Sequence, residues 1–382
     1  MKYRIITFGC QMNKSDSERI ATVLENMKYK LASDISDADL IVVNMCSVRQ
    51  SAVDRVYGLI PKFKKIKTLP AGRQVKTILT GCILKKDKKK FKKGFDLILN
   101  IRDLPSWPLM LKNYPAGAPN QGLNYLEIRP KYQNDFSAFV PISNGCNNAC
   151  SYCVVPFVRG SLICRNHKEI IKETKNAIKQ GFREIWLLGQ NVNDYTSPAD
   201  SSVTEPRRDE GGDEGKLRRR QTSSINFAKL LELVNDIPGD FQIRFISPNP
   251  KNFSDELIEV MAKSKKVAKY LNLPVQSGDN EILKKMGRPY TIEQYKNLVK
   301  KIREKIPNIN LSTDVIVGFP GETKKQFENT VRLFKEIKFN IAYFAKYSPR
   351  LGTAAWQMKD DVPWKEKRRR EKILREIIGK YA

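Results

Sequence analysis

Histidine is nearly absent from this sequence, because His167 is the only one among 382 residues. A single histidine therefore argues against Ser-His or Cys-His catalytic pairs and against metal sites rich in histidine. Long apolar runs are missing too: no stretch approaches the roughly 18 consecutive apolar residues of a membrane-spanning helix. The first residues, 1–8, are typical of a strand and not of a charged leader before an apolar segment. We therefore expect a cytoplasmic protein with no membrane segment.

Cysteine is also sparse, and the seven in the chain are too few for a disulfide scaffold of this size. In a reducing compartment, grouped cysteines more often hold metal or take part in chemistry. Acidic residues are outnumbered, since 41 Asp and Glu stand against 69 Lys and Arg and give a formal net charge of +28. Such an excess attracts polyanions, so nucleic acid is the leading class of partner. Runs such as 85–93 have the plainer interpretation of a solvated helix face.

Three cysteines gather in one short run, 144–157, at the spacing C-x3-C-x2-C. We call Cys146, Cys150 and Cys153 the loop triplet. An iron-sulfur cube has four irons, so three thiolates leave one iron open to bind a small molecule. A structural zinc site would instead recruit a fourth Cys or His, and His167 is the one histidine it could use. The spacing favours the open cube, with a Cys3His zinc site as the alternative.

Three more cysteines each follow an apolar run in the first part of the chain. The runs 3–8, 39–44 and 76–80 lead to Cys10, Cys46 and Cys82, which we call the strand triplet, and helical patterns at 15–27 and 51–64 separate them. This β-α-β-α-β order predicts a parallel sheet whose strands end at one shared edge. We therefore expect the strand triplet to form a second metal site. Three small buried side chains are the alternative.

Beyond a proline-rich linker at 105–130, apolar runs alternate with helical patterns. The expected strands are 138–143, 184–188, 242–247, 270–275, 311–317 and 341–347. The expected helices are 167–180, 227–235, 254–263, 292–305, 323–337 and a basic helix at 364–381. Six βα units predict a parallel sheet curled into a partial barrel, with its chemistry at the carboxyl ends of the strands. The fold class is therefore α/β: an N-terminal parallel βαβ sheet domain (1–125) precedes a partial (β/α)6 barrel (132–382).

One segment interrupts this alternation. Residues 196–224 are polar, of mixed charge and almost free of large apolar side chains, which predicts a low-complexity insertion without a packed core. Its basic run 218–220 is more typical of solvated charge than of an RNA contact. Residues 69–74 have the pattern of a second, smaller surface insertion.

The loop triplet, with Tyr152 before its third cysteine, resembles the cluster signature of radical S-adenosylmethionine enzymes. The run 7–18, together with 44–47 and 80–82, is similar to the methylthiotransferases of that superfamily. Further similar motifs lie at 188–193, 244–248, 273–278, 314–323 and 347–353. The similarity covers nearly the whole chain apart from the insertions.

The resemblance implies two [4Fe-4S] clusters. The loop triplet would hold the one whose open iron binds S-adenosylmethionine, and the strand triplet would hold an auxiliary one. One S-adenosylmethionine would donate a methyl group to a sulfur on the auxiliary cluster, and a second would be cleaved to a 5'-deoxyadenosyl radical. Tyr152, Gln190, Ser247, Gln276 and Gly318 would line the S-adenosylmethionine pocket, with ordinary loop structure as the alternative for the last four.

The run 9–13 is most similar to the tRNA branch of the family, which converts N6-dimethylallyladenosine at position 37 of tRNA to its 2-methylthio derivative. Carbon 2 of adenine has no acidic hydrogen, so its C-H bond calls for a radical that a cofactor supplies. The implied partners are the anticodon loop of tRNA and an electron-donor protein such as a flavodoxin or ferredoxin. The alternatives are a methylthiotransferase for threonylcarbamoyl-adenosine tRNA or a ribosomal protein, and a non-catalytic RNA-binding metalloprotein.

The family also implies a small basic C-terminal β-barrel that binds tRNA. This sequence ends at Ala382 after the expected basic helix. We therefore expect either a truncated chain or a core that binds RNA alone.

Overall fold

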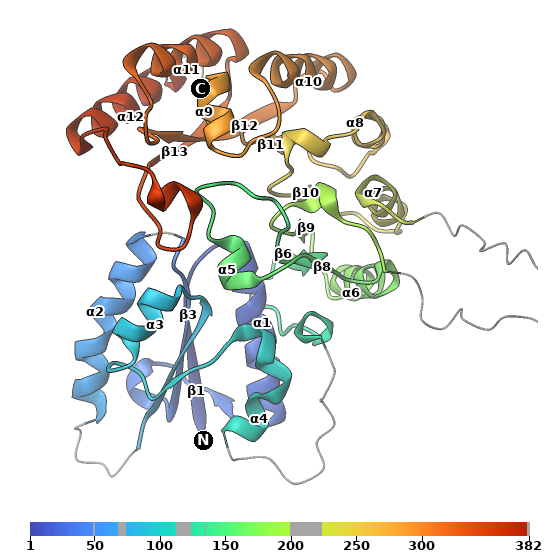
Figure 1. Ribbon diagram of the computed structural model, residues 1–382. Coiled ribbons are helices and arrows are strands. Elements are labelled where there is room, and N and C mark those ends of the chain that lie inside the picture. The colour runs from blue at the N-terminus through green and yellow to red at the C-terminus, as the bar shows by residue number, and fades with distance from the viewer. Residues whose placement is uncertain (49, 68–73, 112–123, 134, 199–223, 380–382) are drawn as a thin grey trace, which may run out of the picture.

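The computed structural model describes residues 1–48, 50–67, 74–111, 124–133, 135–198 and 224–379, and two sheet-based units stack one above the other in it (Figure 1). The predicted insertions at 69–74 and 196–224, including 218–220, lie outside the described residues except at their edges. The two ends of the chain that flank the larger insertion lie side by side, because Thr196 forms an antiparallel bridge with Asn226. The domain boundaries 1–125 and 132–382 stay a prediction.

The first unit is a five-stranded parallel sheet in the order β2-β1-β3-β4-β5. Its strands are β1 (Lys2–Phe8), β2 (Lys30–Leu31), β3 (Leu40–Cys46), β4 (Lys76–Cys82) and β5 (Leu97–Ile98). Its helices are α1 (Gln11–Asn26), α2 (Gln50–Lys67), α3 (Lys85–Phe91) and α4 (Trp107–Met110). The three long strands match the sequence prediction. The short edge strands β2 and β5 were not predicted, because a strand of two residues is too short to show an alternating pattern.

Both faces of this sheet are covered, which explains why β3 reads as a continuous apolar run. Alternate residues of a strand point to opposite faces. Leu40 and Val42 therefore pack with α1 and α4, while Ile41 and Val43 pack on the α2 side.

The segment 105–130 differs from the expected linker, because its described parts pack against the first sheet. Trp107 in α4 is fully buried, as are Leu104 just before it and Leu126 farther along. Tyr125 belongs to the same core. Burying these large apolar side chains stabilises the segment against the sheet despite its prolines.

The second unit has six parallel barrel strands, as predicted. They are β6 (Ser137–Pro141), β9 (Glu184–Leu188), β10 (Gln242–Phe245), β11 (Tyr270–Asn272), β12 (Asn310–Val317) and β13 (Ile341–Lys346). They form two three-stranded sheets, β6-β9-β10 and β11-β12-β13, and an isolated parallel bridge between Ile243 and Val267 links them. The partial barrel therefore has a weak seam between β10 and β11.

Helices wrap the outer face of the barrel strands (Figure 1). They are α6 (His167–Lys179), α7 (Phe227–Asn235), α8 (Asp255–Lys263), α9 (Asn280–Lys285), α10 (Ile292–Lys305), α11 (Lys324–Ile337) and α12 (Trp364–Ile378). A short antiparallel pair, β7 (Ser143–Asn144) and β8 (Ile163–Cys164), flanks α5 (Val155–Arg159). Side chains of Asn226, Ser254, Thr291 and Thr323 cap the helices that follow them, which explains why the predicted starts were close.

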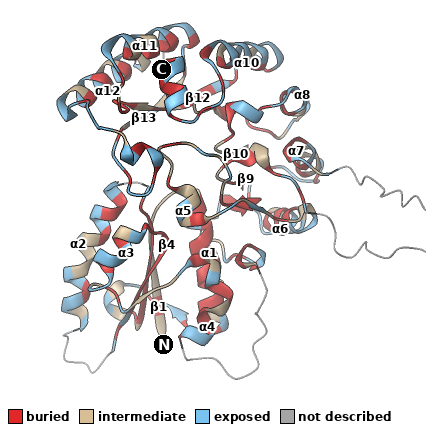
Figure 2. Ribbon diagram, viewed as in Figure 1, coloured by how far each residue is buried: buried red, intermediate tan, exposed pale blue. Residues whose placement is uncertain are grey.

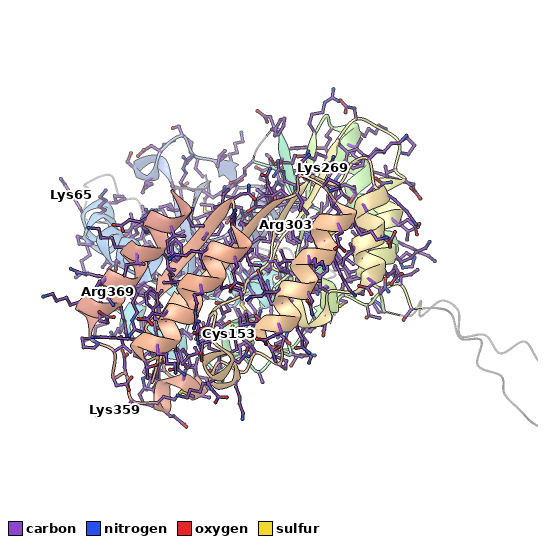
Figure 3. All side chains as sticks on the ribbon, turned by 90° about the horizontal axis from the view of Figure 1, so that it is seen from above. Lys65, Cys153, Lys269, Arg303, Lys359 and Arg369 are labelled. Carbon is purple, nitrogen blue, oxygen red and sulfur yellow. The ribbon has the colours of Figure 1, made fainter. Side chains whose placement is uncertain are left out.

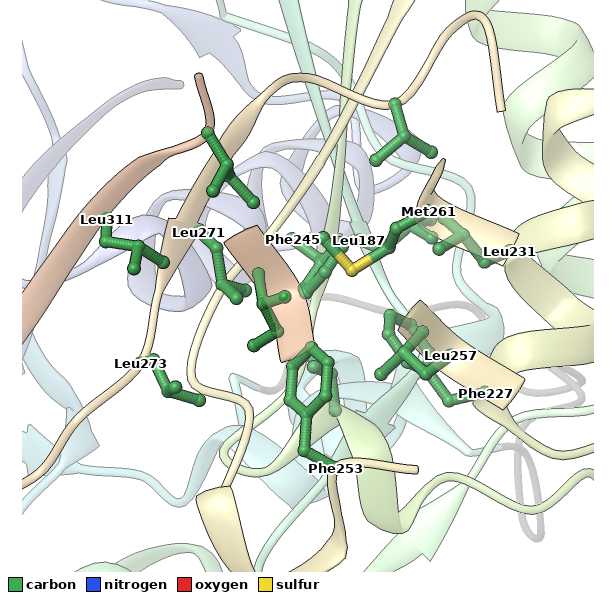
Figure 4. Close-up of a cluster of buried hydrophobic side chains, with 14 of the residues drawn as sticks. Leu187, Phe227, Leu231, Phe245, Phe253, Leu257, Met261, Leu271, Leu273 and Leu311 are labelled. Carbon is green, nitrogen blue, oxygen red and sulfur yellow. The ribbon is translucent and has the colours of Figure 1, made fainter. Parts of the chain in front are cut away.

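One apolar core joins the strands of both barrel sheets to the outer helices. Figure 4 shows a part of it, where Leu187 and Phe245 from the strands meet Leu257 and Met261 from α8. Within the described residues, no helix combines the length and apolarity that crossing a bilayer requires.

Helix α1 lies between the two units and is buried along most of its length (Figure 2). Its Arg19 pairs with Glu173 of α6 at 2.9 Å, and Arg165 pairs with the same carboxylate at 2.8 Å. Its Ser15 donates to the carbonyl oxygen of Phe139 in β6 at 3.1 Å. These buried polar contacts fix the first sheet against the start of the barrel.

Candidate functional site

The strand triplet converges at the carboxyl edge of the first sheet, as the sequence predicts. Cys46 and Cys82 are the last residues of β3 and β4 and stand opposite each other in the ladder. Cys10 follows β1 and is the N-cap of α1. Cys46 and Cys82 are buried, whereas Cys10 is half-buried, and all three are free thiols. Their Sγ atoms thus come from three neighbouring strand ends.

Glycines let the chain turn tightly just before three of the cysteines. Gly81 has φ +102°, and a Cβ there would lie 2.3 Å from the carbonyl oxygen of Met45. Gly145, before Cys146, has φ +83°, and a Cβ there would lie 2.1 Å from the carbonyl oxygen of Ser161. Gly9, before Cys10, is crowded by the side chain of Asn13. Any larger residue at these positions would displace the following cysteine.

An amide pair ties the first turns of α1 to the end of β3, next to the strand triplet. Asn13 donates through Nδ2 to Asn44 Oδ1 at 2.9 Å, and Asn44 donates to the Oγ of Ser17 at 2.9 Å. Asn13 and Asn44 are fully buried. A satisfied buried network of this kind fixes local geometry, here that of Cys10 and Cys46.

The loop triplet lies beyond the first barrel strand, between β7 and α5, where the sequence placed it. The loop docks on the end of α9, because Ser151 N donates to Met286 O at 2.9 Å and Ser151 Oγ donates to Lys285 O at 2.7 Å. Cys153 N donates to Cys150 O at 3.0 Å, which closes the turn between those two cysteines. All three thiols are half-buried.

Cationic and amide donors point at sulfur atoms in both triplets. Arg159 Nε lies 2.9 Å from Cys82 Sγ, and Arg288 Nη1 lies 3.6 Å from Cys150 Sγ. Asn148 directs Nδ2 at Cys146 Sγ at 3.3 Å. Such donors stabilise thiolates and are what iron-sulfur sites use around their ligands. The residues present therefore fit clusters held by anionic sulfur.

Burial, nearby charges and hydrogen bonds shift the pKa values of several cysteines in the triplets and of Arg159. Burial raises the pKa of Cys153 to about 12, so without metal this thiol keeps its proton, whereas a metal-bound thiol is deprotonated. Burial alone would lower the pKa of the Arg159 guanidinium, but Asp16 and Cys82 outweigh burial and raise it well above its usual range. The hydrogen bond that the Cys82 thiol donates to Cys46 raises the Cys82 pKa and lowers that of Cys46.

The zinc alternative would need four ligands around one ion, with His167 as the one histidine. Across the described ranges, no three side chains of His, Cys, Asp or Glu converge on the position of a single ion. Thiolates that hold a cube bind different irons and so lie farther apart than the ligands of one ion. His167 starts α6 and places its Nδ1 2.9 Å from Ser197 Oγ.

Three of the residues expected to line the S-adenosylmethionine pocket share an unusual backbone. Ser247, Gln276 and Gly318 have φ of +60°, +71° and +68°, and each follows a barrel strand. A left-handed conformation at a non-glycine residue is strained, and such residues cluster at functional sites. A Cβ at Gly318 would lie 2.4 Å from Lys367 Cγ, so that position also requires glycine. Their role toward S-adenosylmethionine stays a prediction.

The two other expected pocket residues brace the cysteine loop. Gln190 Oε1 accepts a hydrogen bond of 2.5 Å from Gly145 N, directly before Cys146. Tyr152 packs its ring against the cluster that contains Phe319 and Tyr347, and burial raises the pKa of its phenol. Both therefore lie beside the loop triplet.

Sequence reasoning missed Arg159, Arg288 and Asn148. Arg159 comes from the segment just after the loop triplet but contacts the strand triplet, a pairing across 77 positions. Asn148 lies inside the C-x3-C spacing next to Asn147, and the sequence does not show which of the two amides contacts sulfur.

Two family models match the chain. Residues 140–334 match the radical SAM superfamily, and residues 2–100 match the uncharacterized protein family UPF0004. The first match spans the loop triplet and most of the barrel, and the second spans the strand triplet.

Curated relatives match over nearly the full chain. The tRNA-2-methylthio-N(6)-dimethylallyladenosine synthase of Carboxydothermus hydrogenoformans is 39% identical over 387 residues, covering 98% of this chain and 82% of that protein. The protein of the same name from Clostridium botulinum (strain Okra / Type B1) is 38% identical and covers 100% of this chain and 82% of its own length. That of Fusobacterium nucleatum is 36% identical, covering 100% of this chain and 84% of that protein.

Solved structures share the fold. The radical S-adenosylmethionine methyltransferase TsrM from Kitasatospora setae, with cobalamin and a [4Fe-4S] cluster bound, gives a TM-score of 0.57 at 13% identity and covers 93% of this chain and 77% of that chain. The cobalamin-dependent S-adenosylmethionine radical enzyme OxsB gives a TM-score of 0.57 at 12% identity. The match covers 100% of this chain and 56% of that chain. From the sequence matches, the chain belongs to the radical SAM superfamily and, within it, to the family of tRNA-2-methylthio-N(6)-dimethylallyladenosine synthases.

Proposed function

We propose that this chain transfers a methylthio group to carbon 2 of N6-dimethylallyladenosine at position 37, in the anticodon loop of tRNA. It works in the cytoplasm with an electron-donor protein such as a flavodoxin or ferredoxin. The observation that carries the proposal is the match to curated synthases of that name over the whole chain, with the motifs around both triplets included. The two proposed domains, 1–125 and 132–382, each contribute one triplet.

As a radical SAM methylthiotransferase, the chain uses S-adenosylmethionine and a [4Fe-4S] cluster. We propose a second, auxiliary [4Fe-4S] cluster, with the loop triplet and the strand triplet as the two sets of ligands. When bound, these groups supply the radical that breaks the C-H bond and the sulfur that is transferred. Tyr152, Gln190, Ser247, Gln276 and Gly318 are the proposed surroundings of S-adenosylmethionine.

The protein's own residues orient and shield these sites. Asn148 Nδ2 donates to Cys146 Sγ and to Asp194 Oδ2 at 3.2 Å, so the contact to Asp194 helps to hold the amide against the first cysteine of the loop. Arg288 is held by Pro274 O at 3.2 Å and reaches Cys150 Sγ. Both contacts direct a nitrogen donor at a cysteine sulfur, as iron-sulfur sites do around their ligands.

A single segment touches the surroundings of both triplets, which supports their joint action. In this segment, 347–358, Arg350 donates to Val48 O at 3.2 Å, just beyond Cys46. Ala355 N donates to Ser151 O at 2.8 Å, between Cys150 and Cys153. The segment 347–358 thus contacts both cysteine regions.

Exposed apolar side chains near the triplets fit an unpaired RNA loop. Phe157, just after the loop triplet, is 61% exposed, and Trp356 in the shared segment is 48% exposed. Val48, just after Cys46, is exposed as well. Protein aromatic rings stack on the splayed bases of single-stranded RNA loops, so these side chains suit the anticodon loop.

Basic side chains near the outline of the second unit fit the phosphates of the same RNA. Lys359 and Arg369 lie toward the same side of the view in Figure 3, and both are exposed. The excess of 69 basic over 41 acidic residues acts in the same direction. Phosphate neutralisation of this kind gives affinity without base specificity, so the target base must be selected at the edge that carries the triplets.

Mass spectrometry of tRNA nucleosides tests the proposal. The full chain, reconstituted anaerobically, is incubated with reductant, S-adenosylmethionine and tRNA that carries N6-dimethylallyladenosine. We expect its 2-methylthio derivative to appear. Products on threonylcarbamoyl-adenosine or on a ribosomal protein, with none on this nucleoside, would overturn the substrate assignment.

A further inference from the structure

One arginine side chain connects the two triplets. Arg159, at the end of α5, directs Nε to Cys82 Sγ at 2.9 Å. Its Nη1 donates to Asn144 Oδ1 at 2.9 Å, and Asn144 lies two positions before Cys146. The guanidinium therefore lies between a ligand of the strand triplet and the start of the loop triplet.

The setting of Arg159 is closed to solvent. Its side chain is 2% exposed, and its Nη2 pairs with Asp16 Oδ2 at 2.6 Å, where the Asp16 side chain is 1% exposed. Nη1 also lies 3.4 Å from the hydroxyl of Tyr125. A buried charge is unfavourable unless it is paired and hydrogen-bonded, and Asp16 and Asn144 meet that need. The Nε hydrogen bond to sulfur is then held in a fixed direction with little competition from water.

A cationic hydrogen bond to a cluster ligand has a known electronic effect. Hydrogen bonds to the sulfurs, nearby charge and low solvent exposure all set the reduction potential of an iron-sulfur cluster. A guanidinium beside the Cys82 thiolate offsets negative charge, so it stabilises the reduced cluster, which carries one more electron. Arg288 has the corresponding place at Cys150, but its distance of 3.6 Å marks a weaker contact.

We propose that Arg159 is a positioning residue that raises the reduction potential of the auxiliary cluster and holds Cys82 toward the barrel. This inference rests on the proposed function, since it requires a cluster on the strand triplet. Arg159 belongs to the segment that follows the loop triplet, so the second unit tunes the cluster of the first.

The test isolates the auxiliary cluster. In the full chain, Cys146→Ala, Cys150→Ala and Cys153→Ala together remove the loop ligands, and the midpoint potential of the remaining cluster is followed by electron paramagnetic resonance. In this background we expect Arg159→Gln to lower the potential. Arg159→Lys, which keeps the charge but loses the planar Nε donor, should lower it less.

A matched control is Arg165→Lys. Arg165 is equally buried and ion-paired, to Glu173 at 2.8 Å, and its guanidinium donates to the Pro141 carbonyl oxygen. It should leave the potential unchanged. A potential unaltered in both Arg159 variants, at equal iron content, would overturn the inference while leaving the auxiliary cluster in place.

A second measurement needs no arginine variant. Labelling the guanidinium nitrogens of arginine with 15N should give a hyperfine coupling to the reduced auxiliary cluster in the same loop-ligand background. A spectrum without that coupling would contradict the Nε contact. If the background chain holds no iron-sulfur cluster at all, the proposed function fails as well, and the two failures are thereby told apart.

Discussion

The sulfur atoms of the two triplets have different surroundings, and this difference fits the different roles proposed for them. The loop triplet is half-buried and reached by Asn148 and Arg288, whereas Cys82 and Cys46 are deeply buried beside Arg159. A cluster with an open iron needs access for a small molecule, which suits the half-buried loop. The buried pair, with half-buried Cys10 as the third ligand, suits a cluster that is more protected from solvent.

Substitution of single cysteines should separate these roles. Cys150→Ala removes a loop ligand, so we expect it to abolish 5'-deoxyadenosine formation from S-adenosylmethionine. Cys46→Ala removes a strand ligand, so some 5'-deoxyadenosine should still form while the methylthio product is lost. Both products are measured by mass spectrometry, and equal loss of cleavage in the two variants would refute the division of roles.

Glu18, in the middle of α1, makes stability depend on pH. Burial raises the pKa of its carboxyl from 4.5 to about 8, and the charge of Arg19 opposes this only in part. The folded chain thus keeps a proton that the unfolded chain loses, so the contribution is full below about pH 4.5 and is lost as the pH rises to about 8. At roughly 1.4 kcal/mol per pH unit, the loss reaches a few kcal/mol.

Glu18→Gln removes this titration and keeps an acceptor for Gln133 N. We expect the variant to be more stable than the parent at pH 8 by up to a few kcal/mol and to lose that advantage near pH 4.5. Denaturant unfolding of the metal-free chain measures the difference. A constant difference across this pH range would contradict the assignment.

At the residue scale, the cysteines could be predicted and their donors could not. The loop triplet is encoded in local spacing, and each member of the strand triplet follows an apolar run, so both sets are visible in the sequence. Arg159 is one of 69 basic residues, and only the fold brings it to Cys82. The positive φ of Ser247 and Gln276 likewise depends on how their strands end in three dimensions.

Helix α12 is tied to the barrel by a buried ion pair. Arg370 donates through Nη1 to Glu322 Oε2 at 2.6 Å, and the same oxygen accepts a hydrogen bond of 2.6 Å from Gly318 N. The two side chains are 3% and 2% exposed. The helix thereby fixes the loop after β12, in which Gly318 is a proposed S-adenosylmethionine contact.

Arg370→Gln should therefore destabilise the fold by about 3 kcal/mol or more, because it leaves the Glu322 carboxylate buried without its charge partner. The neighbouring Arg369 is the control, since its side chain is 51% exposed and pairs with Glu366 at the surface. Arg369→Gln should change the free energy of unfolding by less than about 1 kcal/mol. Similar losses in the two variants would argue against the anchoring role.

At the element scale, periodic patterns predicted the long strands and helices. The short or irregular elements could not be predicted in this way. Helix α10 begins and ends where the pattern predicts. The strands β2 and β5 have two residues each, too short for a period, and α4 lies in a segment whose prolines suggested a linker. The segment packs against the first sheet because Trp107 and Leu104 are buried there. The local sequence pattern does not show such tertiary packing.

For the whole molecule, the parallel topology explains why distant segments meet. The strand triplet lies at the carboxyl edge of the first sheet, the loop triplet follows the first barrel strand, and α1 packs between the two units. The α/β order of both units followed from the sequence. How they pack together did not, because it depends on buried contacts such as those of Arg19 and Arg159.

Binding of RNA near the triplets should depend on exposed aromatics there. Phe157→Ala should weaken binding of an anticodon stem-loop by roughly 5- to 150-fold while leaving iron content unchanged, because stacking on one base contributes about 1–3 kcal/mol. Phe136 is a close match, at 60% exposure against 61%, but it lies just before the amino end of β6. Phe136→Ala should bind as the parent does. Equal affinities of both variants for the stem-loop would place the RNA elsewhere.

We propose that the loop triplet and the strand triplet each hold a four-iron cluster. Iron analysis with Mössbauer spectroscopy of the anaerobically reconstituted chain measures the number and type of clusters. We predict roughly eight irons per chain, falling to about four when either triplet is replaced by alanine. Zinc in place of iron, or about four irons in the parent that persist unchanged when the strand triplet is replaced, would contradict the account.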